Sequence, residues 1–84
     1  MPTTEELGIA LAEDVLRAIA ETGDESLVNE VNKIVEASSS ALQEAFMAAV
    51  RAQRSDAKAR QFLQAQLKKA RTTSAALPGE KARG

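Results

Sequence analysis

One stretch of the sequence decides the fold, residues 27–50, which read LVNEVNKIVEASSSALQEAFMAAV. Large apolar side chains such as Val28, Val35 and Phe46 recur in it at helical spacing, with charged residues on the other side. This spacing gathers the apolar residues on one face of an α-helix over about seven turns. The pattern therefore predicts one long amphipathic helix over about residues 25–54.

The residues before this stretch predict a shorter helix, over about residues 4–22. Thr3 and Glu6 fit a capping box, in which each side chain binds a backbone N–H that the first turn leaves free. Gly23 follows the last apolar position, where glycine readily adopts the left-handed conformation that ends many helices. The apolar residues of this helix cover more than half of its circumference, so we expect more than one neighbour to be needed to bury them.

Beyond residue 54 the apolar positions move by roughly a quarter turn around the helix axis. The new set consists of Ala59, Phe62, Leu63, Leu67 and Ala70. The shift predicts a break near residues 54–56 and a third helix over about residues 57–71, with Phe62 in the core. No Gly or Pro marks the break, so a helix that continues through it is the alternative. The small and polar residues 72–84 are expected to be disordered or frayed.

Together these patterns predict an all-α fold, with three helices and a long central helix in a single domain over residues 1–71. No window alternates apolar and polar residues as a strand does. No apolar run approaches the ~18 residues of a membrane helix, and the N-terminal residues lack the features of a signal peptide. We therefore expect a cytoplasmic protein that does not contact a membrane.

The lengths of the predicted helices point to a homodimer. The first helix, folded back on the central one, covers about residues 25–43, and the third covers about residues 39–53. Most of the chain is then two helices thick, and a second chain would complete four-helix sections with a full core. We therefore expect a homodimeric helical bundle, either parallel or antiparallel. Its expected interface comprises Ile9, Leu16, Ile19, Phe46 and Val50.

The sequence offers little for catalysis or cofactor binding. It contains no Cys and no His, so thiolate nucleophiles, imidazole bases and imidazole metal ligands are excluded. The acidic pairs at residues 13–14 and 24–25 lack the spacing of a calcium-binding loop. No glycine-rich phosphate loop is present. We therefore expect no enzymatic activity, no catalytic residue, no metal and no cofactor.

Charge is divided unevenly along the chain. Residues 1–50 carry ten acids and two bases, and residues 51–84 carry nine bases and two acids. The second half contains a predicted basic patch, made of Arg51, Arg54, Lys58, Lys68, Lys69 and Arg71. Such a patch suits nucleic-acid phosphates. It equally suits an acidic surface of the same or a neighbouring chain, which we favour because the total charge is −1 and stacking aromatics are scarce.

These observations lead to one expected function and one alternative. We expect a non-enzymatic protein–protein interaction module, such as an adaptor, chaperone or assembly factor, that acts through its apolar helix faces. Its partner is a second copy of the chain or another protein. The alternative is a nucleic-acid-binding regulator that uses residues 51–71.

Overall fold

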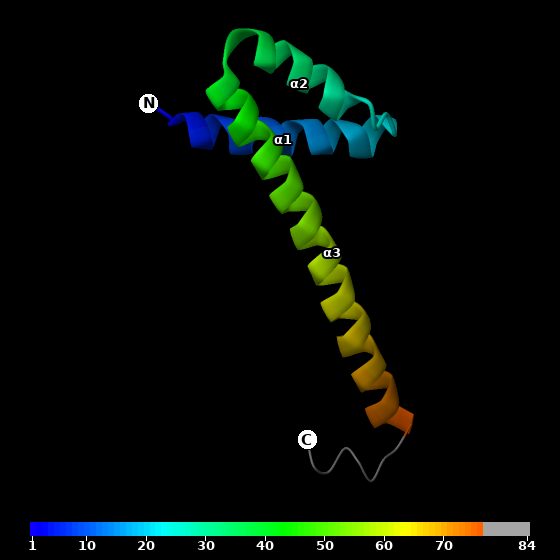
Figure 1. The fold of residues 1–84 in the computed structure, drawn as a ribbon. Helices are drawn as coiled ribbons and strands as arrows, with labels where there is room; N and C mark the ends of the chain where they lie inside the picture. The colour runs from blue at the N-terminus through cyan, green and yellow to red at the C-terminus, as the bar shows by residue number, and fades with distance from the viewer. Residues whose placement is uncertain (77–84) are drawn as a thin grey trace. The chain divides into compact units, whose positions relative to one another are not determined.

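The structure, a computed structural model, describes residues 1–76 of the chain (Figure 1). Within these residues it contains three helices and no strand: α1 (Thr4–Thr22), α2 (Leu27–Ser38) and α3 (Ser40–Ala76). Helices make up 89% of the described residues, which confirms the predicted all-α class with three helices. None of the described helices combines the length and the apolar character that crossing a bilayer requires.

The bounds of α1 agree with the sequence prediction, and both of its predicted ends are confirmed. Thr3 Oγ1 accepts a hydrogen bond from the Glu6 N–H at 3.0 Å, and Glu6 Oε1 accepts one from the Thr3 N–H at 2.8 Å. At the other end Gly23 adopts a φ of 77°, and its N–H donates to the Ile19 carbonyl at 2.7 Å. This left-handed conformation favours glycine over every other residue, which explains why the helix ends there.

The central helix is much shorter than the predicted span of residues 25–54. α2 ends at Ser38, and Ser39 has an extended backbone that interrupts the helix. The Ser39 N–H still donates to the Val35 carbonyl at 2.8 Å, while its hydroxyl accepts from the Leu42 N–H at 3.1 Å. Ser39 therefore closes α2 and caps the start of α3 at once. The prediction that the central helix is the longest is wrong, because α3 has 37 residues and α2 has 12.

The predicted break near residues 54–56 is also wrong, since α3 runs from Ser40 to Ala76 without interruption. The alternative of a helix that continues through this point is confirmed. The predicted third helix, residues 57–71, is thus the later part of α3. Residues 72–76 are helical rather than frayed, and the rest of the predicted tail, residues 77–84, lies outside the described residues.

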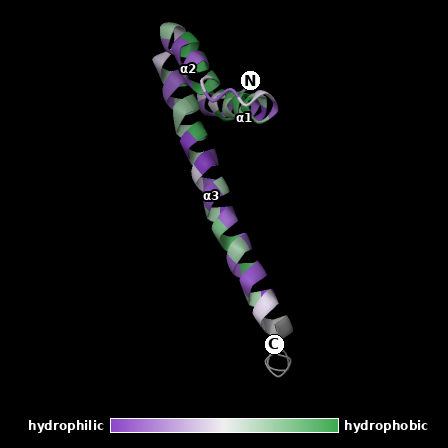
Figure 2. Cartoon of the chain, turned by 90° about the vertical axis from the view of Figure 1, so that its right-hand side faces the viewer, coloured by the Kyte–Doolittle hydropathy of each residue, from purple (hydrophilic) through white to green (hydrophobic). Residues whose placement is uncertain are grey.

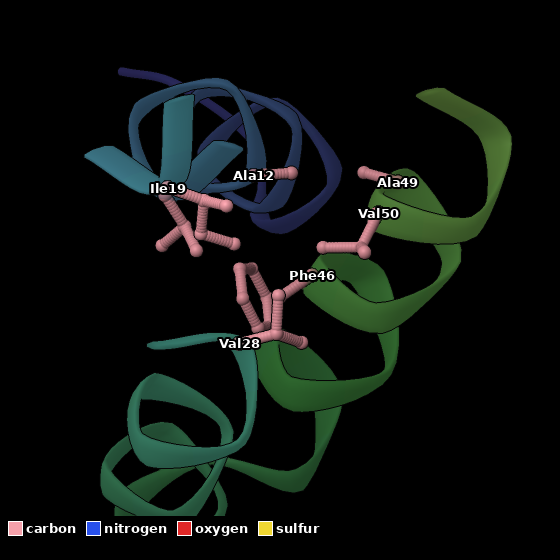
Figure 3. Close-up of a cluster of buried hydrophobic side chains, with 7 residues drawn as sticks. Ala12, Ile19, Val28, Phe46, Ala49 and Val50 are labelled. Atoms are coloured by element: carbon pink, nitrogen blue, oxygen red, sulfur yellow. The ribbon is translucent and has the colours of Figure 1, made fainter. Parts of the chain in front are cut away.

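The chain divides into two compact units, Met1–Arg54 and Ser55–Gly84. The first unit contains α1, α2 and the first turns of α3, and it holds the hydrophobic core. Figure 3 shows Ile19 of α1, Val28 of α2 and Phe46 of α3 pointing toward one another. The buried cluster comprises Ala12, Val15, Ile19, Val28, Phe46, Ala49 and Val50. That residues 1–71 form a single domain stays a prediction.

Phe46 and Val50 are the largest fully buried side chains of this core. The next residue along α3 from Phe46, Met47, packs against the same cluster and is partly buried. The helical pattern of a span over residues 25–54 would place Met47 among polar residues. Met47 therefore lies at the edge of the face of α3 that packs on the core.

Candidate interaction surface

The described part of the second unit is a stretch of α3 in which every side chain from Ser55 to Thr73 is exposed. Three of these side chains are large and apolar: Phe62 is 63% exposed, and Leu63 and Leu67 are each 56% exposed. The predicted core position of Phe62 is therefore wrong. Figure 2 shows hydrophobic and hydrophilic residues following one another closely along this part of α3.

These apolar residues share one side of the helix, together with two alanines. We call this set the apolar stripe: Ala59, Phe62, Leu63, Leu67 and Ala70. The spacing of three, four, eight and eleven positions from Ala59 places all five on one face at 100° per residue. The two ends of the stripe, Ala59 and Ala70, are eleven positions apart, or about 16 Å of helix at 1.5 Å per residue. The shift in apolar positions beyond residue 54 produces this exposed surface.

Basic residues border the apolar stripe on both of its long sides. Lys58 and Lys69 lie along one side and Arg60 and Arg71 along the other, each pair eleven residues apart. Lys68 lies on the opposite face of the helix. Residues 55–73 hold five bases and one acid, which gives a net charge of +4. The stretch is therefore an amphipathic helix with a basic rim.

One of the rim residues has an acidic neighbour on the same helix. Arg60 Nε donates a hydrogen bond to Asp56 Oδ2 at 2.8 Å, and both side chains are mostly exposed. This hydrogen bond, with the charge of the Asp56 carboxylate, raises the pKa of the Arg60 guanidinium above its ordinary value. Arginine is charged at every physiological pH in any case, and this exposed ion pair holds its side chain only weakly.

The predicted basic patch is exposed at all six of its positions. Arg51 and Arg54 belong to the first unit, and Lys58, Lys68, Lys69 and Arg71 to the second. Arg54 Nη2 donates to Glu25 Oε1 at 3.3 Å, an ion pair between side chains that are 46% and 76% exposed. An exposed pair of this kind contributes at most about 1 kcal/mol, so Arg54 remains free to exchange partners.

The predicted dimer interface is divided between the core and the surface. Ile19, Phe46 and Val50 are buried within the core of one chain, with Phe46 fully inaccessible. Ile9 is 43% exposed, and Leu16 is partly buried at the edge of the core. Of the five residues, only Ile9 and Leu16 are therefore open to a second chain in the described fold.

Ile9 and Leu16 lie on one side of α1 with carboxylates beside them. We call this side the acidic face and define it by Glu5, Ile9, Glu13, Leu16 and Ala20. Each of these residues is exposed except Leu16, which is partly buried. The whole of α1 carries five acids and one base, a net charge of −4. The acidic face thus combines apolar side chains with negative charge, as the apolar stripe combines them with positive charge.

A shallow depression lies on the first unit. It is lined by residues of α2 and α3 that include Asn32, Gln43, Glu44 and Arg51. The Gln43 amide donates to the Asn32 amide oxygen at 2.9 Å, so these two side chains satisfy each other. Neither charged group is buried, and within residues 1–73 no three acidic side chains come close enough to hold a metal ion. The depression therefore offers polar contacts and no evident chemistry.

Comparisons of the chain with protein families, with curated proteins and with solved structures found no match.

Proposed function

We propose that this chain is a non-enzymatic protein–protein interaction module, and that its apolar stripe is the docking surface. One observation carries the proposal: Phe62, Leu63 and Leu67 are each more than half exposed on one face of a helix. Covering such a side chain contributes roughly 1.5–3 kcal/mol, so three of them favour association strongly. An amphipathic helix that lays its apolar face into a groove of its partner is a common mode of protein recognition.

The proposal extends to the partner and to the location in the cell. A homodimer remains the assembly that we propose, with Ile9 and Leu16 as the part of the expected interface that is open on the first unit. We also propose that the two chains form a helical bundle and that the protein is cytoplasmic.

Photo-cross-linking from the stripe tests the docking surface. Leu63→benzoylphenylalanine places a photoreactive group within the stripe, and Gln61→benzoylphenylalanine places the same group on the opposite face of the same helix. Irradiation of cells that express each variant should give a protein adduct, with a second copy or another protein, from position 63 and far less from position 61. Equal yields from the two positions, or no protein adduct from position 63, would refute the proposal.

A nucleic-acid-binding regulator is the second candidate, and the exposure of all six basic residues favours it. Binding through phosphates would weaken steeply with salt, because each neutralised phosphate releases counterions. A gel-shift assay at low salt can compare Lys68→Glu/Lys69→Glu with Arg17→Glu/Lys33→Glu, which changes the net charge equally in the first unit. Binding that only the first variant abolishes would support this candidate, and no shift at low salt would exclude it.

A further inference from the structure

We propose that the apolar stripe of one chain docks on the acidic face of α1 in a second copy of the chain. The inference rests on the proposed function and names the partner and the surface that the stripe recognises. The apolar stripe and the acidic face belong to different compact units, and every chain carries both surfaces.

The basic rim argues against pairing of the stripe with itself. Two copies of residues 55–73, each with a net charge of +4, would bring lysines and arginines together along both sides of the contact. Like charges across a helix pair are unfavourable, as opposite charges are favourable. The stripe therefore needs a partner surface whose borders are acidic.

The acidic face supplies that complementary charge within the same chain. α1 has a net charge of −4, and residues 55–73 have +4. Asp14 already pairs with Arg17 at 2.9 Å, and the Glu6 side chain is engaged in the helix cap, whereas Glu5 and Glu13 make no side-chain hydrogen bond or ion pair among the described residues. Glu5 and Glu13 lie at the two edges of the acidic face and are therefore the carboxylates available to meet the two sides of the basic rim of a second copy.

The apolar parts of the two surfaces also match in length. Ile9 and Ala20 are eleven residues apart on α1, as Ala59 and Ala70 are on α3. Each set thus extends along about 16 Å of helix. Ile9 is 43% exposed, which leaves it free to meet Phe62 or Leu63. The contact would cover apolar surface on both helices while their charges stay at its border, where they set orientation more than affinity.

A charge-swap experiment on the full chain tests this contact. Variant one carries glutamate at all four rim positions, Lys58→Glu, Arg60→Glu, Lys69→Glu and Arg71→Glu, and variant two carries Glu5→Lys and Glu13→Lys. In each variant the stripe and the face repel, so sedimentation at low salt should show self-association about tenfold weaker than in the wild-type chain. An equimolar mixture should recover it, because every stripe then meets a face of opposite charge. Lys33→Glu/Arg51→Glu/Arg54→Glu/Lys68→Glu, with the same change in net charge as variant one, should associate like the wild type.

Each other outcome overturns the inference. A wild-type chain that stays monomeric at millimolar concentration would overturn it. A cross-link from position 63 to another protein, and not to a second copy, would also overturn it, but would leave the proposed function standing. Variant one could instead associate with the wild-type chain more strongly than the wild-type chain associates with itself, while variant two self-associates like the wild type. This result would show that the stripe pairs with itself. The mixture could also fail to associate although both variants retain wild-type helicity by circular dichroism. This result would exclude the acidic face as the partner.

Discussion

Gly8 of α1 lies directly against Ala45 of α3. A Cβ atom placed on Gly8 would stand 2.7 Å from the Ala45 Cβ, 2.8 Å from the Ala45 carbonyl carbon and 2.9 Å from the Phe46 nitrogen. Two of these three atoms belong to the backbone, so a side chain at position 8 would have to push the two helices apart. Gly8 is therefore needed for this close approach, although glycine is a poor helix former.

We predict that Gly8→Ala lowers the stability of the first unit. Helix propensity alone would make alanine better by about 1 kcal/mol, but overpacking of this kind costs about 1–3 kcal/mol, so the net change is a loss. Urea denaturation measures it. Ala10→Gly, at an exposed position of the same helix, gives the propensity effect without the contact. A Gly8→Ala variant more stable than the wild type would show that the helices do not meet at this point.

We predict opposite outcomes for the two phenylalanines of the chain. Phe46 is fully buried, and Phe46→Ala should destabilise the first unit by about 3–5 kcal/mol, enough to unfold a domain of this size. Phe62→Ala removes an exposed ring and should change the free energy of unfolding of the dilute chain by less than about 0.5 kcal/mol. Thermal melts followed by circular dichroism would check both, and similar losses would contradict the exposed position of Phe62.

We predict that the hydroxyl of Ser39 stabilises the junction between α2 and α3. Ser39→Ala removes the acceptor of the Leu42 N–H and should cost about 1 kcal/mol, whereas Ser39→Asp keeps a capping oxygen and should cost less. Ser40→Ala, at the next position, serves as the control because no side-chain hydrogen bond of Ser40 occurs among the described residues. If Ser39→Ala and Ser40→Ala unfold at the same urea concentration, the cap does not form.

The sequence pattern could not reveal this junction, for a physical reason. Val28, Val35 and Phe46 keep helical spacing across it, and all three are buried. Apolar periodicity reports which residues are buried, and it is insensitive to a one-residue interruption. The signal that was present is the run Ser38-Ser39-Ser40, since serine is a preferred capping residue.

The sequence pattern shows the shift in apolar positions near residue 54, but this shift does not mark a break in the helix. It marks the last residues of α3 that are shielded, since Gln53 is partly buried and every described side chain beyond it is exposed. Helix propensity favours continuation, as no Gly or Pro occurs between residues 24 and 77. By contrast α1 was predicted in full, because its two ends depend on local chemistry at Thr3, Glu6 and Gly23.

We predict that the carboxyl group of Asp24 titrates at a lower pH than an ordinary aspartate. The Ser26 hydroxyl and the Ser26 N–H donate to Asp24 Oδ1 at 2.6 and 3.0 Å and lower its pKa by stabilising the carboxylate. A depressed native pKa contributes stability above the unfolded-state pKa, and this contribution is lost as the pH falls through the native value. Carbon-13 NMR of the Asp24 carboxyl group would measure the pKa.

Ser26→Ala is the matched variant for this titration. It removes the hydroxyl, the larger cause of the shift, and keeps the backbone N–H. The pKa of Asp24 should therefore rise part of the way toward its ordinary value. An unchanged pKa would mean that the Ser26 hydroxyl does not hold the carboxylate in solution.

The most direct test of docking by the apolar stripe uses the fact that the chain has only two phenylalanines, Phe46 and Phe62. Labelling with 4-fluorophenylalanine gives one fluorine-19 signal from the core and one from the stripe. In a dilution series at low salt, docking on a second copy predicts that the Phe62 signal shifts and loses contact with solvent as the concentration rises. The Phe46 signal should stay unchanged. A Phe62 signal that remains solvent-exposed and constant at every concentration would contradict the proposed contact.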